Sequence, residues 1–112
     1  MSRRAIEPER VAEDIMKILG TATADTVVVR HENGSVIIEG YSHVTRELNG
    51  YKVVWRRAED AVIYLDAETD MVKVYEILRA KVAPRGYTVI YDALSNSVHV
   101  TRLREAKLVS GT

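Results

Sequence analysis

The spacing of apolar and polar positions changes several times along the chain, and each change marks a structural element. Residues 8–19 carry apolar side chains at helical spacing, with charged residues between them. Pro8 suits the first position of a helix, where its missing N–H is not needed, and Gly20 suits the stop. The pattern predicts an amphipathic helix from Pro8 to Leu19 whose apolar stripe is Val11, Ile15, Ile18 and Leu19.

From Asp25 onward the spacing becomes that of β-strands. Asn33-Gly34 lies between two β-branched runs, and a type I′ turn needs a positive φ at both of its central residues. A two-residue hairpin at this turn places Val29 opposite Ile38. Gly40, inside the second run, is typical of a bulge or a bend.

Asn49-Gly50 repeats the same turn signal further along the chain. It predicts a second hairpin in which Val44 lies opposite Trp55. A short turn at residues 58–60 would then place Trp55 opposite Ile63. The pattern predicts a four-stranded meander.

The remaining chain predicts a second helix and a last hairpin. The helix runs from about Glu68 to Val82, with Asp66 or Thr69 as its cap. The hairpin pairs residues 87–92 with residues 98–103. We predict a single α+β domain over residues 1–112: a two-layer fold in the order α-ββββ-α-ββ, with an antiparallel sheet of up to six strands and both helices on one face. Residues 1–6 and 104–112 are expected to be weakly structured ends. In layout this order resembles the folds of bacterial secretion chaperones and of some small nucleic-acid-binding proteins.

Because side chains alternate across a strand, the registers sort them into two sheet faces. One face is almost wholly apolar, so we expect both helices to pack on it and Trp55 to be a core residue. Its members are Val27, Val29, Val36, Ile38, Val44, Tyr51, Val53, Trp55, Ala61, Ile63 and Leu65.

The other face mixes apolar, aromatic and basic side chains, among them Val28, Ile37 and Val62, and a sheet surface of this kind generally contacts a partner. The predicted contact residues are Arg30, Tyr41, His43, Lys52, Val54, Arg56 and Tyr64. The favoured function is a non-catalytic binding module that contacts a second copy or another protein. The alternative is binding of single-stranded DNA or RNA, with tyrosines stacking on bases and cations on phosphates. A small-ligand or enzymatic role is the third possibility.

Charge divides these alternatives. Sixteen basic and sixteen acidic residues give a formal charge of zero, which argues against a strong phosphate binder. Residues 43–57 nevertheless carry four Arg or Lys against one Glu. This local excess keeps the nucleic-acid alternative open.

Few signals of catalysis or cofactor chemistry occur. There is no cysteine, which excludes disulfides and thiolate sites, and the three histidines lack metal-ligand spacing. His99 could lie across a hairpin from Asp92, an arrangement more typical of a cross-strand ion pair than of a catalytic base. No catalytic residue, cofactor or metal is predicted.

No apolar run is long enough to cross a bilayer. No membrane partner is therefore predicted, and we expect a cytoplasmic location. The absence of Gln and Cys and the many charges are typical of a heat-adapted protein.

Overall fold

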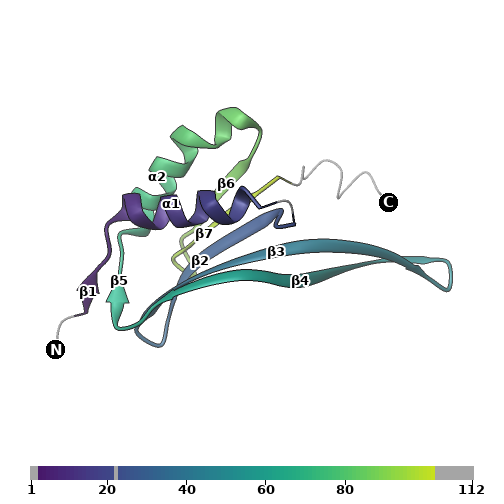
Figure 1. Cartoon of the computed structure of the whole chain (residues 1–112), viewed down its shortest axis with the longest axis horizontal. Coiled ribbons are helices and arrows are strands. Elements are labelled where there is room, and N and C mark those ends of the chain that lie inside the picture. Colours follow the sequence, from purple (N-terminus) through teal and green to yellow (C-terminus); the bar gives the residue numbers. More distant parts are fainter. Residues whose placement is uncertain (1–2, 22, 103–112) are drawn as a thin grey trace.

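The computed structural model describes residues 3–21 and 23–102, and within them the chain forms two layers (Figure 1). The helical layer is α1 (Pro8–Leu19) and α2 (Met71–Lys81), followed by a short 3₁₀ turn, η1 (Ala83–Arg85). The main sheet is antiparallel, in the order β4-β3-β2-β7-β6. Its strands are β2 (Thr26–Glu32), β3 (Ser35–Leu48), β4 (Tyr51–Tyr64), β6 (Thr88–Asp92) and β7 (Ser97–Thr101). The predicted α+β class, with both helices on one face, is confirmed.

A small parallel pair, β1 (Arg4–Ala5) with β5 (Ala67–Glu68), joins the start of the described chain to the segment before α2. The backbone N–H of Arg4 donates to the Asp66 carbonyl at 2.9 Å, and that of Ile6 donates to the Glu68 carbonyl at 2.8 Å. Two-residue strands leave no periodic pattern in the sequence, so neither strand was predicted. Met1, Ser2 and residues 103–112 lie outside the described residues.

The helices follow the predicted pattern, with one correction. Helix α1 has the predicted bounds, but α2 begins at Met71 rather than near Glu68. Its cap is Asp70, whose carboxylate accepts from the Lys73 N–H at 3.2 Å, and not Asp66 or Thr69. Glu68 instead continues the chain as part of β5.

The core lies between the helices and the central strands β2, β3 and β7. The stripe of α1 meets alternate residues of β2 and β3, while α2 covers β6 and β7. The largest fully buried side chains are Ile15, Ile38, Leu78, Val11, Val27, Val29, Val36, Val74, Val98 and Val100. The four residues predicted for the core on the first hairpin are all among them.

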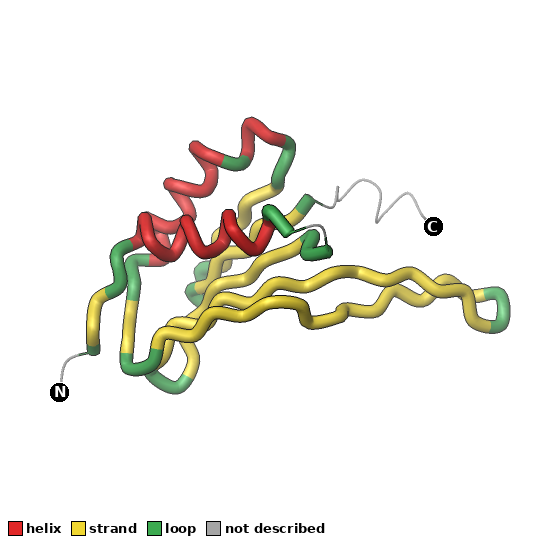
Figure 2. Tube along the Cα trace, viewed as in Figure 1, coloured by secondary structure: helices red, strands yellow, loops and turns green. Residues whose placement is uncertain are grey.

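Strands β3 and β4 form one long hairpin in place of the last three of the four predicted meander strands (Figure 2). The pairing next to both Asn-Gly turns is as predicted, with Val29 opposite Ile38 and Val44 opposite Trp55. No turn occurs at residues 58–60, so the predicted pairing of Trp55 with Ile63 is wrong. Both strands simply continue past this point, each for 14 residues.

A β-bulge replaces the predicted turn. Tyr41 pairs with Ala58 and Glu39 pairs with Ala61, so two residues of β4 lie opposite Gly40 alone. A Cβ on Gly40 would lie 2.4 Å from Cγ2 of Ile18. Only glycine therefore lets α1 pack this closely on the sheet, and the bulge predicted at Gly40 is confirmed.

The bulge also reverses the faces of the residues that follow it. Val62 and Tyr64 pack against the core on the helix side, although they were predicted on the other face. Ala61 and Ile63, predicted for the core, pair with Glu39 and Ile37 on the open face. The error follows from treating residues 58–60 as a turn, because one extra residue shifts the alternation.

In the last hairpin, Asp92 pairs with Ser97, and His99 pairs with Ile90. The cross-strand placement of His99 opposite Asp92 is therefore wrong. The His99 ring nitrogen Nε2 lies 3.1 Å from the Ser97 hydroxyl, and burial lowers the pKa of His99. Ser97 is thus the nearest recorded polar partner of this ring.

Candidate interaction surface: the β3–β4 arm

The outer half of the β3–β4 hairpin extends beyond the rest of the molecule. The last pairing of β3 with β2 is Tyr41 with Thr26, so residues 42–57 pair only with each other. We call residues 42–57 the arm and the other described residues the body. The arm accounts for the elongated shape, 54 × 29 × 28 Å (Figure 1).

One side of the arm continues the face on which the helices pack. Pairing and alternation place five apolar residues there, together with Ser42, Arg46 and Arg57; the apolar residues are Val44, Leu48, Tyr51, Val53 and Trp55. Helix α1 ends at Leu19, and no described helix lies over this part of the sheet. Tyr51 remains 75% exposed, Trp55 51% and Leu48 48%. We call this surface the apolar side of the arm.

The prediction that Tyr51, Val53 and Trp55 belong to the core is therefore wrong for the single chain. The alternation assigned these residues to the correct face, because Trp55 does share it with Val44. Alternation carries no information on how far a covering helix reaches. The face is therefore left exposed where α1 stops.

The opposite side of the arm is mostly polar and continues the open face of the sheet. Glu47 lies opposite Lys52, and Thr45 opposite Val54, which is 52% exposed. The Arg56 guanidinium lies 4.1 Å from the centre of the Tyr41 ring, a cation–π contact. The Tyr41 ring is thus already covered on one face.

The predicted contact residues divide between the two faces. Six of them share the open face: Arg30, Tyr41, His43, Lys52, Val54 and Arg56. Tyr64 lies on the other face, where its hydroxyl donates to the Asp14 carboxylate of α1. The pKa of Tyr64 is raised, mainly by burial and to a smaller extent by this hydrogen bond.

Charges on the open face of the body are largely neutralised by their neighbours. Arg30 contacts Glu32 at 2.7 Å and Glu39 at 2.9 Å. Its hydrogen bond to Glu39, together with that from the Tyr41 hydroxyl, lowers the pKa of the Glu39 carboxyl. Burial and the contact with Glu39 raise the pKa of Tyr41. These groups are already engaged with one another.

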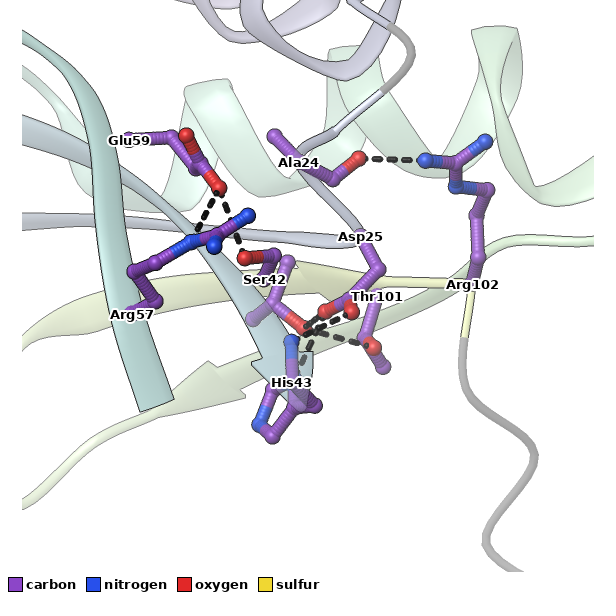
Figure 3. Close-up of polar contacts among 9 residues, drawn as sticks. Ala24, Asp25, Ser42, His43, Arg57, Glu59, Thr101 and Arg102 are labelled. Atoms are coloured by element: carbon purple, nitrogen blue, oxygen red, sulfur yellow. Dashed lines mark hydrogen bonds and ion pairs between the residues drawn. The ribbon is translucent and has the colours of Figure 1, made fainter. Parts of the chain in front are cut away.

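Asp25 attaches β3 to the body where the arm begins (Figure 3). Its carboxylate accepts from the backbone N–H of His43 at 2.8 Å, and its other oxygen lies 2.7 Å from the His43 ring nitrogen Nδ1. The Thr26 hydroxyl donates to the same carboxylate at 2.8 Å. Burial favours a higher pKa for Asp25, but these hydrogen bonds outweigh it and lower the pKa.

The strand β4 has its own attachment at the same level. Glu59 accepts from the Ser42 hydroxyl at 2.7 Å and from Arg57 Nε at 3.3 Å (Figure 3). The hydrogen bond from Ser42 is the main reason why the pKa of the Glu59 carboxyl is lowered. Neither Asp25 nor Glu59 was selected from the sequence. Each makes contacts with residues that the sequence pattern did not place beside it: Asp25 with His43, and Glu59 with Ser42.

Comparison with protein-family models, with curated proteins and with solved structures found no match. Within the described part of the chain, no helix is long and apolar enough to cross a membrane. No three His, Asp or Glu side chains in residues 3–21 and 23–102 are grouped so that they could hold a metal ion. The arm and the surfaces around it are the most distinctive features of the molecule.

Proposed function

We propose that the protein is a non-catalytic binding module whose arm binds a second copy of the same chain. One observation carries the proposal. The apolar side of the arm carries five apolar residues on the face that the helices cover in the body, yet Trp55 and Tyr51 are more than half exposed. A surface of this composition on a projecting element is typical of an interface.

The energetics of the arm support a partner. A two-stranded ribbon alone is marginally stable in water. Aromatic side chains bury roughly 150–250 Å² each, so covering the exposed parts of Trp55 and Tyr51 would remove about 250 Å² from water. At ~25 cal/mol per Å² this is worth about 6 kcal/mol per arm before the cost of association.

A second copy of the chain is the partner favoured by the buried area and by the charge distribution. In a two-fold pair each arm is covered once, so the gain is doubled and the assembly closes. The two aromatic rings of both arms supply about 500 Å², a large part of the ~1,200–2,000 Å² buried in stable interfaces. The chain has sixteen basic and sixteen acidic residues, and the arm holds four of the basic and one of the acidic residues. The rest of the chain therefore has twelve basic and fifteen acidic residues. The chain is therefore electrostatically complementary to itself.

Single-stranded nucleic acid is the alternative partner, and the positive charge of the arm favours it. It has less support, because Arg56 covers one face of the Tyr41 ring and Tyr64 is tied to Asp14 on the other side of the sheet. Arg30, the predicted contact cation that lies on the body, is already paired with two glutamates. On the open face, where the contact with nucleic acid was predicted, few rings are therefore left to stack on bases.

The test of the proposal is sedimentation velocity over a wide range of protein concentration. We expect the wild-type chain to form a dimer, and both Trp55→Ser and Tyr51→Ser to weaken it by at least tenfold. Leu94→Ser is the matched control, because Leu94 is a fully exposed apolar residue of the body. It should dimerise like the wild type. A wild-type chain that stays monomeric at high concentration would exclude this function.

The alternative is tested with a single-stranded oligonucleotide at two salt concentrations. Phosphate binding would weaken steeply with salt and with Arg56→Ala. The proposal predicts no measurable binding at physiological salt. Tight, salt-sensitive binding by a monomer would favour the nucleic-acid function instead.

A further inference from the structure

The body has a wide pocket of about 660 Å³ at the end of the molecule opposite the arm. Residues of β1, β5, the β2–β3 turn and the starts of both helices line it. The partly or fully buried Ile6, Pro8 and Ala67 contribute its apolar lining. Four exposed carboxylates surround them: Glu7, Glu32, Glu68 and Asp70. We call this the acidic pocket.

The pocket keeps a negative charge after its internal contacts are counted. Glu32 is paired with Arg30, and Asp70 caps α2. Within the described residues, no ion pair is recorded for Glu7 or Glu68, and Arg3 is the one Arg or Lys in the lining. Carboxylates therefore outnumber cations around the pocket.

The tip of the arm has the complementary character. Leu48 and Tyr51 flank the terminal turn as an exposed apolar pair. Behind them, Arg46 lies on the same side of the ribbon and Lys52 on the other, opposite Glu47, so the tip has two cations and one carboxylate. An apolar tip with a basic surround matches a pocket that has an apolar lining and an acidic surround. A volume of ~660 Å³ lies in the range of pockets that hold ligands of ~300–1,000 Å³, so a tyrosine side chain would fit.

The dimensions of the molecule allow the contact to be reciprocal. Each strand of the arm has about seven residues, which at ~3.3 Å per residue gives a reach of about 23 Å. Two antiparallel copies, each 54 Å long, would bring either tip beside the opposite end of its partner. Such a two-fold arrangement closes, whereas head-to-tail stacking would continue as an open chain.

We infer that the tip of each arm docks in the acidic pocket of a second copy, with Leu48 and Tyr51 inside and Arg46 and Lys52 facing the carboxylates. The inference rests on the proposed function, self-association through the arm. It adds the surface on the partner that receives the tip.

A charge-exchange experiment tests this contact. One variant reverses the tip (Arg46→Glu with Lys52→Glu), and a second reverses the pocket (Glu7→Lys with Glu68→Lys). Each variant alone should self-associate at least tenfold more weakly than the wild type at low salt, because like charges meet at both contacts. An equimolar mixture should regain an affinity within about threefold of the wild type, because every contact of the mixed pair is again complementary.

Glu13→Lys with Glu76→Lys is the matched control, since both residues are exposed on the helices and neither lines the pocket. This variant should dimerise like the wild type and should not rescue the tip variant. Two results would overturn the inference: reversed variants that dimerise normally, or a mixture that stays as weak as its components. In either case, dimerisation that still requires Trp55 would leave the proposed function standing. A monomeric wild type would contradict both the inference and the proposed function.

Discussion

The body and the arm use the same alternation of side chains but differ in what covers it. In the body, the inward residues Val27, Val29 and Ile38 are completely buried beneath α1 and α2. In the arm, Trp55 and Tyr51 lie on the same face of the sheet yet are more than half exposed. Apolar alternation therefore identifies a sheet face suited to burial, but it does not show how much of that face the helices of the same chain cover.

The largest expected effect is on folding of the body. Ile15→Ala removes a completely buried side chain of α1 and should lower the free energy of unfolding by about 2–5 kcal/mol. Urea titration at low protein concentration measures this loss. Leu94→Ala, at a fully exposed site, should change it by less than ~0.5 kcal/mol. Equal effects at the two sites would contradict the assignment of the core.

A smaller loss is expected at the boundary between body and arm. Gly40→Ala places a methyl group 2.4 Å from Cγ2 of Ile18, and such overpacking should cost about 1–3 kcal/mol in unfolding free energy. Ile18→Ala removes the clashing atom. The double variant should therefore lose less than the sum of the two single variants. Strict additivity in the urea titrations would show that the two residues do not meet.

The attachment of the arm should depend on pH. The pKa of Asp25 is lower in the folded protein than its ordinary value, so its ionised form stabilises the fold above the unfolded pKa of ~3.9. This contribution is lost as the pH falls through the lower, folded pKa. Asp25→Asn should cost about 1 kcal/mol at pH 7, with the difference from wild type shrinking in acid. Asp60→Asn, at an exposed carboxylate, is the control. A cost that is independent of pH would contradict the role of the carboxylate.

The smallest expected effect on folding is in the arm itself. Trp55→Ser should change the unfolding free energy of the dilute monomer by less than ~0.5 kcal/mol, because the side chain is half exposed. The same substitution is expected to abolish most of the self-association. If the dilute monomer were strongly destabilised instead, Trp55 would belong to the core of the single chain.

Local signals in the sequence predicted the first helix and both Asn-Gly hairpins correctly. The turns succeed because a type I′ geometry is a property of two residues, and Asn33 and Gly34 adopt the expected positive φ of 50° and 75°. Asn49 and Gly50 do the same, with φ of 51° and 81°. These elements need no information from the rest of the chain.

The errors in the prediction arise where contacts between residues distant in the sequence determine the structure. Glu59 and Asp60 are polar and suit a turn, but the pairing of β4 with β3 continues through them as a bulge. The bulge then moves Tyr64 away from the predicted contact face and towards Asp14. The pattern gave the last residue of α1 correctly, but it could not show that this end lies short of Trp55 on the sheet. The turns of the sheet could therefore be predicted from local sequence. The exposed surface of the arm could not, because it depends on contacts between distant residues.

The single tryptophan of the chain lies on the apolar side of the arm, opposite Val44, so its fluorescence reports directly on whether that side is covered. We expect the emission of Trp55 to shift to shorter wavelength as the protein concentration rises, with the same midpoint as dimer formation in sedimentation. Tyr51→Ser should move both midpoints to higher concentration. An emission maximum that stays at the wavelength of an exposed tryptophan at every concentration, in a protein that sediments as a monomer, would contradict the account.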